Sequence, residues 1–187
     1  FTQPLAPFSL NHINKFNNNP IAAQERTFER LIRKAGSTSF GKDHDFASIK
    51  TYDDFRRHVP IADYEDLKPY IDRVVQGESD VMWPGKPIYL AKTSGTTSGV
   101  KYIPISKESM PEHLNGARNA LFSYIHESGK SDFVDGRIIF LQGSPVLERK
   151  NGINFGRLSG IVANHVPAYL QKNLLPTYKT NCIEDWE

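Results

Sequence analysis

One decapeptide carries most of the information in this sequence: Lys92-Thr93-Ser94-Gly95-Thr96-Thr97-Ser98-Gly99-Val100-Lys101. It lies between two strand-like segments, 87–91 and 102–105. Because glycine has no Cβ, backbone N–H groups of such a turn can converge on an anion, and the hydroxyls add uncharged donors. Lys101, with Lys92 as a second candidate, would supply positive charge. The decapeptide therefore predicts a loop that binds a polyphosphate.

Two phosphate-binding patterns can be compared with this loop. A Walker A loop has four residues between its glycines and ends in Gly-Lys-Ser/Thr at the start of a helix. Here three residues separate Gly95 from Gly99, Val100 stands between glycine and lysine, and a β-branched run follows. The loop is therefore not a Walker A loop. The order Thr93-Ser94-Gly95-Thr96-Thr97-Ser98-Gly99-x-Lys101 resembles the ATP-phosphate signature of the acyl-adenylate-forming superfamily.

The composition is that of an ordinary globular protein, with 39% hydrophobic and 24% charged residues among 187. The 23 basic and 21 acidic residues are interspersed, which argues against a nucleic-acid footprint or a polybasic membrane patch. No apolar run approaches the roughly 20 residues of a membrane span. The single cysteine, Cys182, excludes an internal disulfide framework and is typical of the reducing cytoplasm.

Helical spacing of apolar residues and end signals predict four helices. Capping boxes are expected at Thr51, Asp63 and Ser109. The predicted helices are 20–35, 51–57, 63–75, and one from Ser106 or Ser109 to about 128, with an apolar stripe of Met110, Leu114, Ala117, Leu121 and Ile125. Segments 1–19 and 37–49 are predicted to be irregular. Within the second, Asp43-His44-Asp45 is interpreted as a solvated loop, because adjacent residues cannot all face one metal ion without a special turn.

The rest of the chain alternates helical and strand-like patterns, which predicts an α/β fold with helices packed on a mixed sheet. The apolar run 137–142 predicts a buried strand, and 166–172 a helix. The glycine-rich segment 151–160 fits either a pocket lining or a plain connection. Within it, Arg157 could pair with a carboxylate bidentately. His165 could act as a base, although the sequence identifies no partner for it.

Several short segments precede the loop in a fixed order: Thr38-Ser39-Phe40-Gly41-Lys42, Val59-Pro60-Ile61, Asp63-Tyr64-Glu65, Gly77-Glu78 and Trp83-Pro84-Gly85. Together with the loop they resemble the Gretchen Hagen 3 (auxin-responsive promoter) family of acyl acid amido synthetases. The resemblance runs along most of the chain and is sharpest over 93–101. It implies that 1–187 is a single, partial N-terminal adenylation domain, part of an adenylate-forming large domain. The family is best known from plants, and the asparagine- and lysine-containing sequence suggests a bacterial member.

The resemblance also implies a reaction, in which ATP and Mg²⁺ are used in two steps. A carboxylate attacks the α-phosphate, pyrophosphate leaves, and the amine of an amino acid captures the acyl-adenylate. Lys101 is implied as the catalytic residue through its charge on the phosphates, not as a base. Arg157, Leu158 and Ser159 align loosely with the acyl-acid pocket helix of the family. The implied ATP phosphate-binding residues are Thr93, Ser94, Gly95, Thr96, Thr97, Ser98, Gly99 and Lys101.

Three features of the family are not found in the sequence: a Tyr-x-Ser-Ser-Glu-like motif, a Tyr-Arg-x-Gly-Asp-like motif, and a C-terminal domain with its mobile lysine. The chain starts at Phe1 and stops in a segment, 181–187, that resembles the opening of a helix. We therefore expect an incomplete portion of a synthetase, inactive by itself. The alternatives are a nucleotide- or phosphate-binding module without catalysis, and an interaction domain in which the loop is only a connection.

Overall fold

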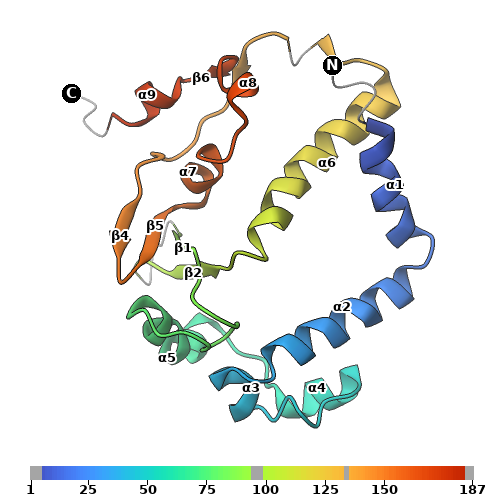
Figure 1. Cartoon of the computed structure of the whole chain (residues 1–187), viewed down its shortest axis with the longest axis vertical. Helices are drawn as coiled ribbons and strands as arrows, with labels where there is room; N and C mark the ends of the chain where they lie inside the picture. Colours follow the sequence, from blue (N-terminus) through green and yellow to red (C-terminus); the bar gives the residue numbers. More distant parts are fainter. Residues whose placement is uncertain (1–5, 94–98, 133–134, 184–187) are drawn as a thin grey trace.

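A four-stranded mixed sheet, ordered β2-β1-β5-β4, organises the chain (Figure 1). The computed structural model describes residues 6–93, 99–132 and 135–183. This arrangement confirms the predicted α/β fold with helices on a mixed sheet. The elements are α1 (Ala6–Asn17), α2 (Pro20–Ala35), α3 (Ser39–Asp43), α4 (Tyr52–His58), α5 (Tyr64–Val75), β1 (Tyr89–Lys92), β2 (Tyr102–Ile105), α6 (Met110–Ser128), β3 (Ile138–Ile139), β4 (Glu148–Lys150), β5 (Ile153–Arg157), α7 (Leu158–Ala163), α8 (Ala168–Gln171), β6 (Leu174–Leu175) and α9 (Tyr178–Asn181).

β1 is an inner strand of the sheet, and its alternating side chains join two different cores. Leu90 is fully buried in a cluster with Val74 of α5 and Phe155 of β5. Ala91 faces the opposite side and joins a cluster with Ile161 of α7 and the first residue of α6. Since successive strand residues point to opposite faces, this four-residue strand is covered on both sides. Figure 1 shows α5 and α7 on opposite sides of it.

The glycine-rich segment predicted as a pocket lining or connection is instead a β-hairpin that completes the sheet. β4 and β5 pair antiparallel across a two-residue turn, Asn151-Gly152, with φ of 53° and 81°. Positive φ at both positions is the signature of a type I′ turn, for which Asn-Gly is the favoured sequence. β5 then runs parallel to β1, with Lys92 opposite Arg157.

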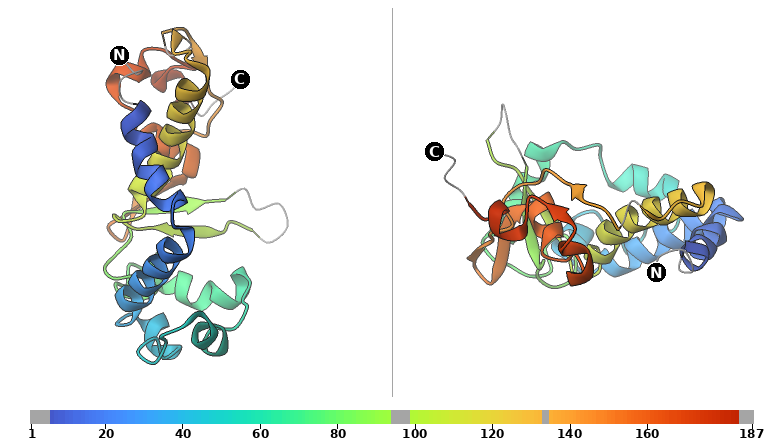
Figure 2. Two further views of the ribbon diagram at one scale, coloured as in Figure 1. Left: turned by 90° about the vertical axis from the view of Figure 1, so that its right-hand side faces the viewer. Right: turned by 90° about the horizontal axis from the view of Figure 1, so that it is seen from above.

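The N-terminal helices agree with the two capping boxes predicted there and differ from the prediction elsewhere. Two of the three predicted capping boxes, at Thr51 and Asp63, are present. The predictions of irregular structure before residue 20 and over 37–49 are wrong, because α1 and α3 lie there. α3 is a five-residue helix begun by buried Thr38, whose Oγ1 accepts the Gly41 N–H at 3.0 Å. α1 packs along α6 (Figures 1 and 2), a tertiary contact that no local signal reports.

α6 has the predicted length but not the predicted cap. Ser109 is already in the helical region, with φ −81° and ψ −23°, and its Oγ accepts the Ser106 N–H at 3.0 Å. The capping box expected at Ser109 is therefore absent. Met110 and Ile125 of the predicted stripe are buried, whereas Leu121 is 47% exposed. No helix within the described ranges, α6 included, is long and apolar enough to cross a membrane.

The C-terminal part carries a second, two-stranded parallel sheet of β3 and β6. The prediction of a buried strand over 137–142 is wrong in both length and burial. Only Ile138 and Ile139 are in strand conformation, and the exposed fractions of Ile139, Phe140 and Leu141 are 74%, 50% and 83%. β3 pairs with β6 alone in the described part of the chain, so nothing there buries the apolar run. The predicted helix at 166–172 is shortened to α8.

Candidate functional site

The predicted phosphate loop leaves the sheet at the carboxyl end of β1 and returns as β2. The Thr93 N–H donates to the Lys101 carbonyl at 3.0 Å, which continues the β1–β2 ladder past Lys92 and closes the neck of the loop. Gly99 has φ +79°, a conformation that favours glycine. Of the predicted phosphate ligands, the structure therefore places Thr93, Gly99 and Lys101 at the neck. The remaining ones, Ser94, Gly95, Thr96, Thr97 and Ser98, lie outside the described residues.

Lys101 is supported by the first residue of α5. Its Nζ lies 5.0 Å from the centroid of the Tyr64 ring, within cation–π range. The same tyrosine accepts, at its Oη, the N–H of Tyr102 at 2.9 Å. Asp63, the N-cap of α5, fixes this end of the helix by accepting the N–H of Asp66 at 3.1 Å. The start of α5 thus holds the strand that carries Lys101.

Lys92, the second candidate cation, already has a carboxylate partner. Its Nζ lies 2.9 Å from Oε1 of Glu148 on β4, and 28% of the Lys92 side chain is exposed. Lys101 has no ion pair with any described residue. Among the described residues, the charge of Lys92 is therefore compensated by a carboxylate and that of Lys101 is not.

The second predicted site segment lies at the same edge of the sheet. Since β1 and β5 are parallel, their carboxyl ends meet there, and Arg157 stands opposite Lys92 in the register. α7 begins at the next residue, Leu158, which is 41% exposed. Ligands of open α/β sheets commonly bind outside the carboxyl ends of the strands. The structure thus brings together the loop neck and the predicted acyl segment, which are far apart in the sequence.

A close-packed strap over 143–145 fixes α7 against the sheet. Ser159 Oγ accepts the Gly143 N–H at 3.0 Å, and Asn164 Nδ2 donates to the Pro145 carbonyl at 2.9 Å. A Cβ on Gly143 would lie 2.5 Å from Arg157 Cδ, and a Cβ on Gly160 would lie 2.1 Å from the Ser144 carbonyl oxygen. At position 160 the neighbour is backbone, so only glycine fits, whereas at position 143 the Arg157 side chain would have to shift. The strap therefore holds Arg157 and Ser159 in place.

Sequence reasoning missed the residues that support the site. Tyr64, Glu148 and Gly143 contact site residues that lie far from them in the chain, so no spacing pattern links them. The missing partner of His165 is Tyr89, whose Oη lies 3.0 Å from Nε2. Tyr89 is the first residue of β1, at the end opposite the loop, so this pair does not join the site.

The fold has counterparts among solved enzymes. A structure titled AtGH3.15 acyl acid amido synthetase in complex with 2,4-DB matches 96% of this chain with a TM-score of 0.73 and 21% identity, and the match covers 32% of that chain. A second structure, GH3.15 acyl acid amido synthetase, matches 84% of this chain with a TM-score of 0.71 and 20% identity. At these identities the likeness establishes the shared fold.

The sequence comparisons define the family. The GH3 family N-terminal domain matches residues 9–185, and the chain therefore belongs to the GH3 family, which confirms the resemblance inferred from the short segments. Jasmonoyl–L-amino acid synthetase JAR4 of Nicotiana attenuata is 27% identical over 136 residues, 71% of this chain and 23% of JAR4. Indole-3-acetic acid-amido synthetase GH3.2 of Arabidopsis thaliana is 29% identical over 104 residues, 54% of this chain and 19% of GH3.2. The matches thus cover a quarter or less of these relatives.

Proposed function

We propose that this chain supplies the ATP phosphate-binding part of an acyl acid amido synthetase. Such an enzyme adenylates a carboxylic acid and transfers the acyl group to an amino acid. The observation that carries the proposal is the meeting of two features at one sheet edge. These are the loop neck with Lys101, which has no ion pair with a described residue, and the β5–α7 segment with Arg157. The names of the family relatives, which are amido synthetases for jasmonic or indole-3-acetic acid, support the same activity.

In the proposed reaction, a different cationic side chain of the protein binds each of the first two substrates, ATP and the carboxylic acid. An oxygen of the acid carboxylate bonds to the α-phosphorus of ATP while the bond to the pyrophosphate oxygen breaks. The amine then bonds to the acyl carbon, AMP leaves with the bonding electrons, and the nitrogen loses a proton. Lys101 would stabilise the charge that gathers on pyrophosphate, since fixed cations act on developing charge. Arg157 would hold the acid carboxylate through its two-pronged guanidinium.

The described residues fit ATP phosphates through Lys101, whereas the Thr93 N–H already donates to the Lys101 carbonyl. In the described ranges no group of three or more His, Cys, Asp or Glu residues could hold a metal ion. Mg²⁺ is commonly carried by substrate phosphates together with one or two carboxylates. We therefore assign the Mg²⁺ of the proposed reaction to the ATP phosphates.

Calorimetric titration of the chain with Mg·ATP tests the phosphate site. Lys101→Ala should weaken binding by roughly ten- to a hundredfold, since a hydrogen bond to a charged group contributes about 1.5–3 kcal/mol. Lys107→Ala is the matched control, because Lys107 follows the far end of β2 and should leave binding unchanged. Equal binding by the unsubstituted chain and Lys101→Ala would remove the loop from the phosphate site.

A second measurement separates a synthetase from a phosphate-binding module. Exchange of labelled pyrophosphate into ATP should depend on an added carboxylic acid when the complete encoded polypeptide is assayed. Mg·ATP binding without exchange across a broad panel of acids would favour the binding module. The acid that supports exchange would also identify the first substrate.

A further inference from the structure

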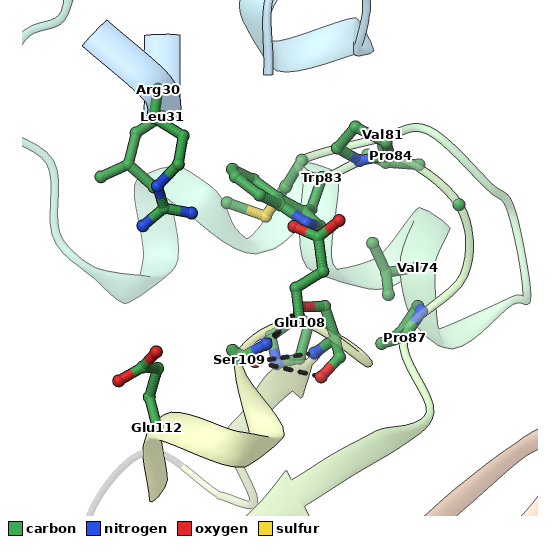
Figure 3. Close-up of a pocket in the computed structure, with 14 residues that line it drawn as sticks. Arg30, Leu31, Val74, Val81, Trp83, Pro84, Pro87, Glu108, Ser109 and Glu112 are labelled. Carbon is green, nitrogen blue, oxygen red and sulfur yellow. Dashed lines mark hydrogen bonds between the residues drawn. The ribbon is translucent and has the colours of Figure 1, made fainter. Parts of the chain in front are cut away.

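A cavity of about 360 Å³ opens between α2, the turn that leads into β1, and the start of α6 (Figure 3). Its lining includes Pro87 before β1 and Pro104 in β2. Pro104 is three residues along the strand from Lys101, which corresponds to about 10 Å, and Pro87 lies beyond the far end of β1. The volume falls within the roughly 300–1,000 Å³ of small-molecule sites. The cavity is therefore separate from the proposed adenylation site.

The walls of the cavity come from two apolar clusters. Val74 and Val81, which are 4% and 1% exposed, belong to the cluster around Leu90. Trp83 packs on the second cluster, which belongs to the α2 side of the fold. Leu31 of α2 also lines the cavity and is 42% exposed. The cavity thus lies between two cores that do not fill it, and it presents apolar side chains on more than one side.

The polar groups nearest to Trp83 are already satisfied. The Trp83 side chain donates a hydrogen bond to the Glu108 carboxylate, and Lys34 Nζ donates to the same carboxylate at 2.6 Å. These contacts, led by the Lys34 hydrogen bond, lower the pKa of Glu108, so that it stays ionised and paired at neutral pH. Since the indole N–H is engaged, Trp83 offers a ligand its ring and no donor.

The backbone of the lining is equally short of free donors. The Ser106 N–H donates to Ser109 Oγ and the Ser109 N–H to Ser106 Oγ, both at 3.0 Å. The Gly85 N–H donates to the Asp80 carboxylate at 2.8 Å. Three further lining residues are prolines, which have no N–H: Pro84, Pro87 and Pro104. The inner lining therefore provides little for a polar ligand to bind.

The two remaining charged groups of the lining, Arg30 and Glu112, are exposed and stand at the mouth (Figure 3). Water solvates both, so neither requires a ligand. A charged ligand that moved past them toward Val74 and Val81 would lose its hydration without gaining a partner, and such a transfer is costly. The cavity therefore selects against ions.

We propose that this cavity binds an uncharged aromatic molecule whose ring lies on Trp83. Burial of apolar surface against Leu31 and Val74 drives binding, and the contact between the two rings adds to it. This ligand belongs to a different chemical class from the carboxylic acid and the amino acid of the proposed reaction, which are both charged. The proposal is independent of that reaction, because no residue of the phosphate loop takes part.

Trp83 is a built-in reporter for the test. The chain has two tryptophans, and a Trp186→Phe background leaves Trp83 as the only one. Bromine quenches tryptophan fluorescence on contact, so titration with 4-bromobenzyl alcohol should give saturable quenching. The anion 4-bromobenzoate and the cation 4-bromobenzylammonium carry the same ring and should bind at least about tenfold more weakly, because each must lose the hydration of its charge. All three are tested on one protein, so the comparison does not depend on how variants fold.

Substitutions on α2 locate the bound ring. Leu31→Gln should weaken binding of 4-bromobenzyl alcohol roughly threefold or more, since it removes apolar surface from the wall. Ile21→Gln is the matched control, because Ile21 is 70% exposed on the same helix and lies outside the lining. Leu141→Lys, in the exposed run that follows β3, and Lys101→Ala should both retain binding.

Three results would overturn the proposal. They are no saturable quenching by 4-bromobenzyl alcohol, equal affinity for the neutral and the charged molecules, and equal effects of Leu31→Gln and Ile21→Gln. Each can occur whether or not the chain binds Mg·ATP, so the outcome is separate from that of the proposed function.

Discussion

At the scale of single residues, Tyr64 connects two parts of the site. Its ring lies under the Lys101 ammonium group at 5.0 Å, and its hydroxyl accepts the Tyr102 N–H. The position of the lysine that we assign to ATP is thus coupled to the start of α5. From the sequence alone, Tyr64 is recognised only as the first residue of a helix, because its partners Lys101 and Tyr102 are distant in the chain.

Two substitutions at Tyr64 separate these contacts. Tyr64→Phe keeps the ring but leaves the Tyr102 N–H without its acceptor, so we expect a loss of about 1 kcal/mol in the free energy of unfolding. Tyr64→Leu also removes the cation–π contact and should weaken Mg·ATP binding further. Urea unfolding and calorimetric titration measure the two effects. Tyr52→Phe, at an exposed ring on α4, is the control, and an equal loss there would contradict a specific role for Tyr64.

Asp54 makes a second prediction at this scale, concerning pH. Its hydrogen bonds with Thr51 and Arg57 hold its pKa below the ordinary value for aspartate. A lowered pKa in the folded state stabilises the protein above the unfolded pKa of about 3.9, and this stabilisation is lost as the pH falls through the folded value.

Thermal unfolding at neutral and acidic pH measures this effect. Asp54→Asn should lower Tm at about pH 7 and flatten its acid dependence below about pH 4. Asp53→Asn serves as the control, because its ion pair with Arg56 is long, at 3.8 Å, and exposed on both sides. A Tm profile that Asp54→Asn leaves unchanged would show that the capping carboxylate contributes nothing.

At the scale of elements, the sequence predicted a helix start correctly where the capping hydrogen bond joins residues that are close in the chain. α2, α4 and α5 begin at the caps read from the sequence, because cap and capped N–H are three residues apart. α3 depends on Asp80 and Val81, whose carbonyls accept the N–H groups of Ser39 and Phe40. Such contacts across the fold leave no trace in spacing, and the same holds for the strap that fixes Arg157.

Two helical glycines, Gly160 of α7, which packs against the strap, and Gly116 of α6, should change the stability in opposite directions when replaced by alanine. Gly160→Ala would place a Cβ 2.1 Å from the Ser144 carbonyl oxygen, so backbone must move, and such overpacking costs about 1–3 kcal/mol. Gly116→Ala in α6 meets no atom within 4 Å and should stabilise the protein by about 0.4–1 kcal/mol. Urea denaturation of both variants tests the pair. If the Gly160→Ala protein is as stable as the unsubstituted chain, segment 143–145 can move away from the added Cβ without a cost in stability.

At the scale of the whole molecule, the β1–β2 ribbon separates two regions of different chemistry. The end that carries Thr93 and Lys101 presents a cation that has no ion pair with a described residue, whereas the end that carries Pro87 and Pro104 opens into a cavity of about 360 Å³. Figure 2 shows the ribbon crossing the molecule between the lobe of α2–α5 and the remaining elements. A ligand at either end therefore contacts a different set of elements.

The short β3–β6 ribbon has a consequence for how this chain behaves in a test tube. Ile139 of β3 and the following Phe140 and Leu141 are exposed, and β6 is the one strand that pairs with β3 in the described part of the chain. Exposed apolar edges recruit strands from other molecules. We expect the chain to self-associate as its concentration rises, with light scattering increasing steeply. Leu141→Lys, two residues beyond β3, should shift the onset to higher concentration, whereas Ile61→Lys, at a fully exposed isoleucine far from β3 in the sequence, should not. If both substitutions act alike, general surface hydrophobicity rather than the strand edge limits the solubility of this protein.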